Sequence, residues 1–301
     1  MVTARAGGVK RAATCFRGQR SVAKTGTMLV AALQFDVRRG ATASNTEVVL
    51  NELERAAERG IALVVLPEMW PSSFPGPESD LAALVAADDD AWTRVAQAGA
   101  RLGVSVCGSA FGGVERGLPA NRWRLFDAGE CRSAYDKLHL FSPTAENESF
   151  SAGDRPPACV ELRGARVSGL VCYDLRFPEL TRLAFRAAAD LVCISAQWPV
   201  ARAANWRALA AGLAAQNQCF VVACNRTGVD VIGRRELTLE FPGNSLLVDP
   251  HGRVLAEGRG ENGLIEAELD LALARDLRRR VPVERDQRSE LYARWSREPR
   301  G

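Results

Sequence analysis

Short apolar runs alternate with amphipathic segments along residues 28–275, and this alternation restricts the fold more than any other feature of the chain. Runs such as LVVLP and LVCISA have no polar side, which is typical of strands that are covered on both faces. Segments with helical periodicity separate them, one opening with a capping box at Ser44–Asn45–Thr46–Glu47 and another spanning about residues 80–102. This repeated strand–helix–strand order predicts an α/β fold.

The same pattern predicts one folded domain. No linker rich in Pro, Gly or Ser interrupts residues 28–296, and an apolar content of 47% is sufficient for a large core. We therefore expect a single domain over residues 28–301, with a charged C-terminal arm after Leu277. Residues 1–27 carry six basic side chains and no acidic one, and we expect them to be a disordered extension, with a targeting peptide as the alternative.

Charge and composition exclude several classes of protein. Because six basic residues lie within the first 27 positions, the rest of the chain is mildly acidic and offers no basic surface to nucleic acid. No apolar run reaches the roughly 18–20 residues that span a bilayer, so no contact with a membrane is expected. Eight cysteines without a secretory signature are expected to be mostly buried free thiols in the cytoplasm. Two distant histidines, His139 and His251, and the absence of a C-x-x-C motif argue against a metal site.

Three reactive side chains stand at the ends of predicted strands, where α/β proteins build their sites. Glu68 ends LVVLPE, Lys137 follows AYD, and Cys172 ends GLVC. Each has a structural interpretation by itself: a capping glutamate, an exposed hairpin lysine or an inert buried thiol. Together they form a chemically coherent set, because a desolvated carboxylate can deprotonate a thiol and an ammonium can stabilise an oxyanion. The set predicts acyl transfer with a cysteine nucleophile.

The segments that hold these residues resemble the nitrilase superfamily of carbon–nitrogen hydrolases. PEMW (67–70), YDKLHLF (135–141) and CYDLRFPEL (172–180) are similar, in order, to the signature segments of that superfamily. SAQWP (195–199) and NQCFVVACNR (217–226) extend the resemblance, which covers roughly residues 28–275. It implies a four-layer αββα sandwich, a homodimer or higher homo-oligomer, and hydrolysis of a small amide without any cofactor.

The resemblance also implies roles for individual residues. Glu68 corresponds to the general base, Cys172 to the nucleophile, and Lys137 to the oxyanion stabiliser, with the backbone N–H of Tyr173 as a second donor. The implied reaction passes through a cysteine thioester and releases ammonia.

The resemblance implies a second glutamate and also reveals departures. The family segment E-x-x-x-F/Y-x-x-G begins here at Glu146, with Glu148 as the alternative. Ser73 stands where the family often has Gly, and Leu213 and Gln216 replace a common Arg and Glu. The last two changes suggest an exchanged structural ion pair, although a reshaped pocket or dimer face is the alternative.

The string CYDLR is similar to the branch that contains omega-amidases and deaminated glutathione amidases. The resemblance to omega-amidases implies removal of the terminal amide of 2-oxoglutaramate or 2-oxosuccinamate, and this is the leading hypothesis. An amidase acting on a larger acid, such as deaminated glutathione, is the second hypothesis. A catalytically silent scaffold protein with this fold is the third, and the intact Glu68, Lys137 and Cys172 argue against it.

Two further residues are candidates for binding substrate. Arg176 suits a carboxylate, because a guanidinium forms paired, charge-assisted hydrogen bonds with it. Trp198 follows a predicted strand and is expected to form an apolar wall of a small pocket. The alternatives are an ion pair of Arg176 with Glu179 or Asp174, and an ordinary core position for Trp198.

Overall fold

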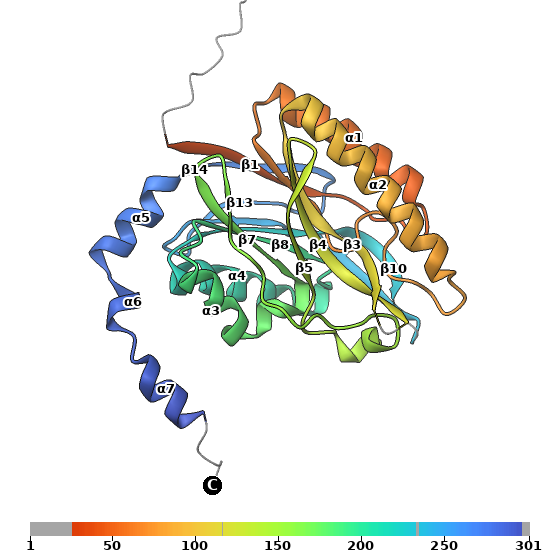
Figure 1. Ribbon diagram of the computed structural model, residues 1–301. Coiled ribbons are helices and arrows are strands. Elements are labelled where there is room, and N and C mark those ends of the chain that lie inside the picture. Colours follow the sequence, from red (N-terminus) through yellow and green to blue (C-terminus); the bar gives the residue numbers. More distant parts are fainter. Residues whose placement is uncertain (1–25, 116, 233–234, 297–301) are drawn as a thin grey trace, which may run out of the picture.

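Two six-stranded sheets pack face to face, and helices cover the outer face of each sheet (Figure 1). The computed structural model describes residues 26–115, 117–232 and 235–296. The layers follow the order helix, sheet, sheet, helix, which confirms the predicted α/β class and the four-layer αββα sandwich. Residues 1–25 of the predicted N-terminal extension lie outside the described residues.

The first sheet has three parallel strands with antiparallel strands on both sides. Its order is β14-β1-β2-β3-β4-β5, and β1, β2 and β3 are parallel. The strands are β1 (Thr27–Gln34), β2 (Leu63–Val65), β3 (Ser105–Glu115), β4 (Leu118–Asp127), β5 (Glu130–Asp136) and β14 (Gly263–Asp270). All three residues of β2 are buried, as expected for a strand covered on both faces.

The second sheet repeats this plan. Its order is β13-β12-β9-β8-β7-β6, and β7, β8 and β9 are parallel. The strands are β6 (Val160–Leu162), β7 (Ala165–Val171), β8 (Leu191–Ala196), β9 (Phe220–Asn225), β12 (Leu246–Val248) and β13 (Val254–Glu257). A separate antiparallel pair, β10 (Thr227–Ile232) and β11 (Leu237–Pro242), extends beyond the end of β9.

Each sheet is covered by two helices that bury one face. The helices α1 (Thr42–Glu58) and α2 (Leu81–Leu102) pack on the first sheet, and α3 (Pro178–Arg186) and α4 (Ala203–Asn217) on the second (Figure 1). Three further helices follow β14: α5 (Leu271–Arg280), α6 (Val283–Asp286) and α7 (Ser289–Trp295). No residue of α6 or α7 is buried.

The start of α1 differs from the predicted capping box. The helix begins at Thr42, two residues before Ser44, and no side chain caps it. Asn45 is buried instead, with its amide bonded to the backbone of Arg38 and to the carbonyl of Pro71, the latter at 2.7 Å. The capping-box prediction was therefore wrong, because the tertiary contacts of Asn45 place it inside the first turns of the helix.

The parallel strands of the two sheets bring three chemistry-bearing segments together. Glu68 follows β2 of the first sheet, Cys172 follows β7 of the second, and Gln197 follows β8. Gln197 bonds Glu68 twice, its backbone N–H donating to the carboxylate at 3.0 Å and its side-chain amide to the Glu68 carbonyl at 2.9 Å. Strand ends of opposite sheets therefore meet at one place.

The described part of the chain contains seven cysteines, all of them free thiols, whereas Cys15 lies outside it. Across residues 26–115, 117–232 and 235–296 no helix is both long and apolar enough to cross a membrane. Over the same ranges no group of three or more His, Cys, Asp or Glu side chains is arranged to hold a metal ion.

Trp123 of β4 in one sheet packs directly on Gly169 of β7 in the other. The Trp123 side chain is buried, and a Cβ built on Gly169 would lie 2.4 Å from its Cε2 atom. No ordinary Cβ contact is that short, so the indole lies directly on the backbone of the opposite sheet.

We expect Gly169→Ala to destabilise the protein, since the added methyl group must separate the sheets or displace the indole. Overpacking of this kind lowers the free energy of unfolding by about 1–3 kcal/mol, which denaturant titration measures. Gly212→Ala in α4 is the control: a Cβ there meets nothing within 4 Å, and we expect a gain of about 0.5–1 kcal/mol. A Gly169→Ala protein as stable as the wild type would contradict this account of the interface.

Candidate active site

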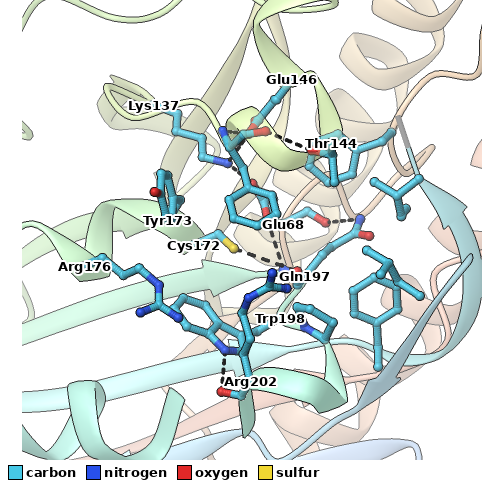
Figure 2. Close-up of a pocket in the computed structure, with 16 residues that line it drawn as sticks. Glu68, Lys137, Thr144, Glu146, Cys172, Tyr173, Arg176, Gln197, Trp198 and Arg202 are labelled. Atoms are coloured by element: carbon cyan, nitrogen blue, oxygen red, sulfur yellow. Dashed lines mark hydrogen bonds and ion pairs between the residues drawn. The ribbon is translucent and has the colours of Figure 1, made fainter. Parts of the chain in front are cut away.

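One cavity contains every residue that the sequence singled out for chemistry or binding. It has about 470 Å³ of empty space and is lined by side chains from both sheets, their connecting turns and the β10–β11 pair (Figure 2). The lining residues are Glu68, Phe74, Lys137, Phe141, Thr144, Glu146, Cys172, Tyr173, Arg176, Gln197, Trp198, Pro199, Arg202, Ile232, Leu239 and Phe241. A few polar groups converge in a mostly apolar wall, which is typical of a small-molecule site.

Lys137 is held between two carboxylates at the buried end of the cavity. Its Nζ atom lies 2.8 Å from Glu68 Oε1 and 2.8 Å from both carboxylate oxygens of Glu146. All three side chains are buried. Burial by itself would lower the pKa of Lys137, but the charges of Glu146 and Glu68 outweigh it and raise that pKa above its ordinary value. The lysine is therefore a permanent cation at physiological pH.

The two candidate glutamates differ in burial. Glu146 is 3% exposed, opens the 3-10 turn η2 (Glu146–Glu148) and accepts a hydrogen bond from the backbone N–H of Phe141 at 2.6 Å. Glu148, at the other end of the same turn, is exposed. The structure thus brings Glu146, and not its neighbour, to Lys137.

Asn121 completes the cluster and was not singled out from the sequence. This fully buried residue of β4 donates from its side-chain amide to Glu68 Oε1 at 2.8 Å and to Glu146 Oε1 at 3.4 Å. The available signal was its polarity beside the apolar residues of a strand. Gln197 was missed in the same way, although its amide bonds are what fix the orientation of Glu68.

Cys172 stands at a strained position directly after β7. It begins the 3-10 turn η3 (Cys172–Arg176) with φ of 43°, a left-handed conformation that costs a non-glycine residue energy and is concentrated at functional sites. Its Sγ atom lies 3.8 Å from the carbonyl oxygen of Gln197 and within hydrogen-bonding reach of the Glu68 carboxylate. The turn thus aims the sulfur into the cavity, toward Glu68 and Gln197 (Figure 2).

The electrostatics of the cluster favour a neutral thiol in the resting site. Burial raises the pKa of Cys172 well above its ordinary value, and the charge of Glu68 raises it further, although Lys137 opposes both. Burial also raises the pKa of Glu68, again against the effect of Lys137. Passing the proton from Sγ to Glu68 leaves the charge of the cluster unchanged, whereas losing it to water would add a second uncompensated negative charge. The arrangement therefore suits activation of the thiol by Glu68 during attack.

Asp174 connects the nucleophile turn to the segment that carries Lys137. Its buried carboxylate accepts hydrogen bonds from the Tyr135 hydroxyl at 2.9 Å and the His139 backbone N–H at 3.0 Å. It also accepts a longer bond, 3.4 Å, from the N–H of Val171, directly before Cys172. These bonds fix the position of the sulfur relative to the ammonium.

The three expected binding residues all line the cavity. Tyr173 meets the ring of Phe141 edge-on, with ring centroids 5.0 Å apart. The guanidinium of Arg176 lies over the ring of Trp198, 5.0 Å from its centroid. Among the described residues Arg176 forms no ion pair with Glu179 or Asp174, the alternative considered from the sequence. Its guanidinium donates instead to Asn205 Oδ1, at 3.4 Å.

Ser73 stands where the family often has glycine, and its backbone has the left-handed conformation that glycine adopts most easily. Its φ is 61°, and its hydroxyl donates to Asp230 Oδ2 at 2.8 Å. The buried Arg226 bonds the same carboxylate oxygen at 2.9 Å and Gln197 Oε1 at 3.2 Å. This second polar network therefore supports Gln197 from the side away from Glu68.

The other two departures lie outside the cavity. Leu213 is buried within α4, and Gln216 is exposed, with its carbonyl oxygen accepting a bond from Arg182 at 3.0 Å. Neither residue lines the cavity, so these changes do not alter the groups that face a bound molecule.

Comparison with known proteins agrees with this geometry. Residues 29–279 match the carbon-nitrogen hydrolase family. A 2-oxoglutaramate amidase from Bacillus subtilis is 36% identical over 268 residues, which are 87% of this chain and 98% of that protein. A solved carbon–nitrogen hydrolase superfamily protein from Xanthomonas campestris, with an arsenic adduct in its active site, is 31% identical with a TM-score of 0.76, covering 87% of this chain and 97% of that one.

A second solved structure is informative about the sulfur. It is a mutant of an amidase from Nesterenkonia sp. AN1, 26% identical with a TM-score of 0.78 over 90% of this chain and 98% of that one. The active-site cysteine of that amidase carries the acetamide moiety of fluoroacetamide. The match to the family covers far more than half of the present sequence. This chain belongs to the carbon-nitrogen hydrolase family and is a hydrolase of amide carbon–nitrogen bonds.

Proposed function

We propose that this enzyme removes the terminal amide of a small carboxylate-bearing substrate of the 2-oxoglutaramate or 2-oxosuccinamate type. The observation that carries the proposal is the division of the cavity into two ends. One end holds Cys172 beside Glu68, which is bonded to Lys137, and the other presents the guanidinium of Arg176 over Trp198. The similarity to a 2-oxoglutaramate amidase supports the same substrate class.

The first half of the proposed reaction forms a thioester. The thiol proton of Cys172 passes to Glu68 while Sγ attacks the amide carbon. The oxyanion that results is stabilised by Lys137, a permanent cation, and by the backbone N–H of Tyr173. Protonated Glu68 then gives the proton to the departing nitrogen, and ammonia leaves.

The second half releases the acid. Glu68 accepts a proton from a water molecule while the oxygen of that water attacks the thioester carbon. Lys137 and the backbone N–H of Tyr173 stabilise the second tetrahedral intermediate as they do the first. The carbon–sulfur bond breaks, and protonated Glu68 returns its proton to the departing sulfur, which restores the thiol. Glu68 accepts and returns one proton in each half of the reaction. The amide and water therefore give the acid and ammonia with no other reactant. Glu146 and Asn121 position Lys137 and Glu68 and exchange no atom with the substrate.

Replacing Cys172 by Ala is expected to abolish ammonia release from short 2-oxo-acid amides, because no thioester can form. A coupled ammonia assay measures this, and acid-quenched wild-type enzyme should carry the acyl group on the peptide that contains Cys172. Cys131→Ala, which removes an exposed thiol, is the control and should keep full activity. Ammonia release at the wild-type rate from Cys172→Ala would refute the assignment. A panel that includes deaminated glutathione and neutral amides distinguishes the alternative substrates.

The pH dependence of Cys172 alkylation tests Glu68 as the base. Because the pKa of Glu68 is raised, its basic form is lost at a higher pH than an ordinary glutamate, so alkylation by iodoacetamide should slow as the pH falls through that raised value. Glu68→Gln removes the proton acceptor, and we expect the rate constant at neutral pH to fall by about 10² or more. Glu148→Gln, at an exposed neighbouring acid, should leave the profile unchanged. Identical profiles for Glu68→Gln and wild type would contradict this role.

We also infer that the enzyme acts as a cytoplasmic homodimer. Free thiols fit a reducing compartment, and the aromatic side chains of Tyr292 and Trp295, 48% and 51% exposed on α7, suit burial against a second copy. Sedimentation of the full chain should give twice the 32.5 kDa chain mass. A monomer at micromolar concentration, or activity recovered outside the cytoplasmic fraction, would contradict the respective part of this inference.

A further inference from the structure

Arg202 is a cavity residue for which neither the sequence motifs nor the proposed chemistry has a use. It ends the 3-10 turn η4 (Val200–Arg202) that follows β8, and its side chain lines the same cavity as Cys172 (Figure 2). In the described part of the chain no carboxylate forms an ion pair with it. Its guanidinium lies over the ring of Phe141, 5.3 Å from the centroid.

The backbone of Arg202 is fixed, although its side chain is not engaged by an acid. The indole N–H of Trp198 donates to its carbonyl oxygen at 2.8 Å, and its own N–H donates to Pro199 at 3.0 Å. A tight turn with two such bonds holds the base of the side chain in place. The guanidinium is therefore presented at a defined position beside Phe141 and is available to a ligand.

The end of the cavity that is lined by Arg176 and Arg202 carries an excess of positive charge. Both acids of the cavity, Glu68 and Glu146, are bonded to Lys137 at the reactive end. This leaves the guanidiniums of Arg176 and Arg202, one against Trp198 and one against Phe141, without a counter-charge among the described lining residues. Two cations beside apolar walls attract an anion more strongly than they would in open water, because the walls displace solvent.

We propose that Arg202 is a specificity-determining residue and forms, with Arg176, a two-arginine clamp for the carboxylate of the substrate. This rests on the proposed function, since it specifies how the far end of the same amide substrate is bound. Arg202 supplies a two-pronged grip on the carboxylate, and Arg176, which lies on Trp198 and is bonded to Asn205, supplies donors from the other side. With the carboxylate held there, the terminal amide points toward Cys172.

The test compares an anionic and a neutral substrate of similar length: the terminal amide of a five-carbon 2-oxo acid, and pentanamide. We expect Arg202→Gln to lower kcat/KM for the anionic amide by about 10- to 100-fold, mainly through KM, with less than about a threefold effect on the neutral amide. Arg202→Lys keeps the charge but loses the paired geometry, and an intermediate loss is expected. Arg176→Gln should give a loss of the same kind, and the double variant should lose less than the product of the two single losses.

Arg186→Gln, at an exposed arginine of α3, is the matched control and should change neither substrate. The clamp would be overturned if Arg202→Gln changed kcat/KM equally for both amides, or if that variant kept the wild-type preference for the anionic amide. Either result would leave the amidase chemistry in place. Failure of the wild type to release ammonia from either amide would instead overturn the proposed function. If Arg202→Gln does not fold, the Arg202→Lys protein decides between the same outcomes.

Discussion

The buried ion cluster of Glu68, Lys137 and Glu146 is the interaction on which the rest of the site depends. Removing one charge from such a cluster leaves the others unpaired in a medium of low polarity, which costs several kcal/mol, about 3–5 for a typical buried pair. Glu68 lies in the segment after β2, Lys137 directly after β5 and Glu146 in the turn η2, so the cluster joins distant segments of the chain. Asn121 donates to the same Glu68 oxygen as Lys137, and the backbone N–H of Gln197 donates to the other oxygen.

In the proposed mechanism, this cluster allows a cysteine to act as the nucleophile without a histidine beside it. A buried thiol is a poor acid, and the Glu68 carboxylate makes a free thiolate still less favourable. The same carboxylate is, however, a base of raised pKa within reach of the sulfur. Because the proton only moves within the cluster, the total charge stays constant while Lys137 remains available for the oxyanion. Asp174 fixes the turn η3, which carries Cys172, relative to the segment that carries Lys137, because its carboxylate accepts bonds from both.

The two ends of the cavity are built on one short segment after β8. Gln197 orients Glu68 and contacts the sulfur through its carbonyl oxygen, Trp198 carries the guanidinium of Arg176 on its ring, and Arg202 closes the segment. The six residues 197–202 thus relate the reacting carbon to the proposed carboxylate site. A rigid turn suits this task, because an error in spacing between the two ends would misplace the amide relative to the sulfur.

The sequence by itself determined the class of fold, because hydrophobic periodicity is a local property. Their positions after apolar strands also predicted Glu68, Lys137 and Cys172 as a chemically coherent set. Glu146 was also identifiable through its segment, although only burial separates it from Glu148. Tertiary structure alone decided which polar residues support the cluster. Polarity beside apolar residues is the one local signal of Asn121 and Gln197, and it does not identify their partners, which other strands and turns supply. Arg202 has no local signal. The misplaced start of α1 has the same cause: the amide of Asn45 is bonded to Pro71, a contact that no pattern in its own segment reveals.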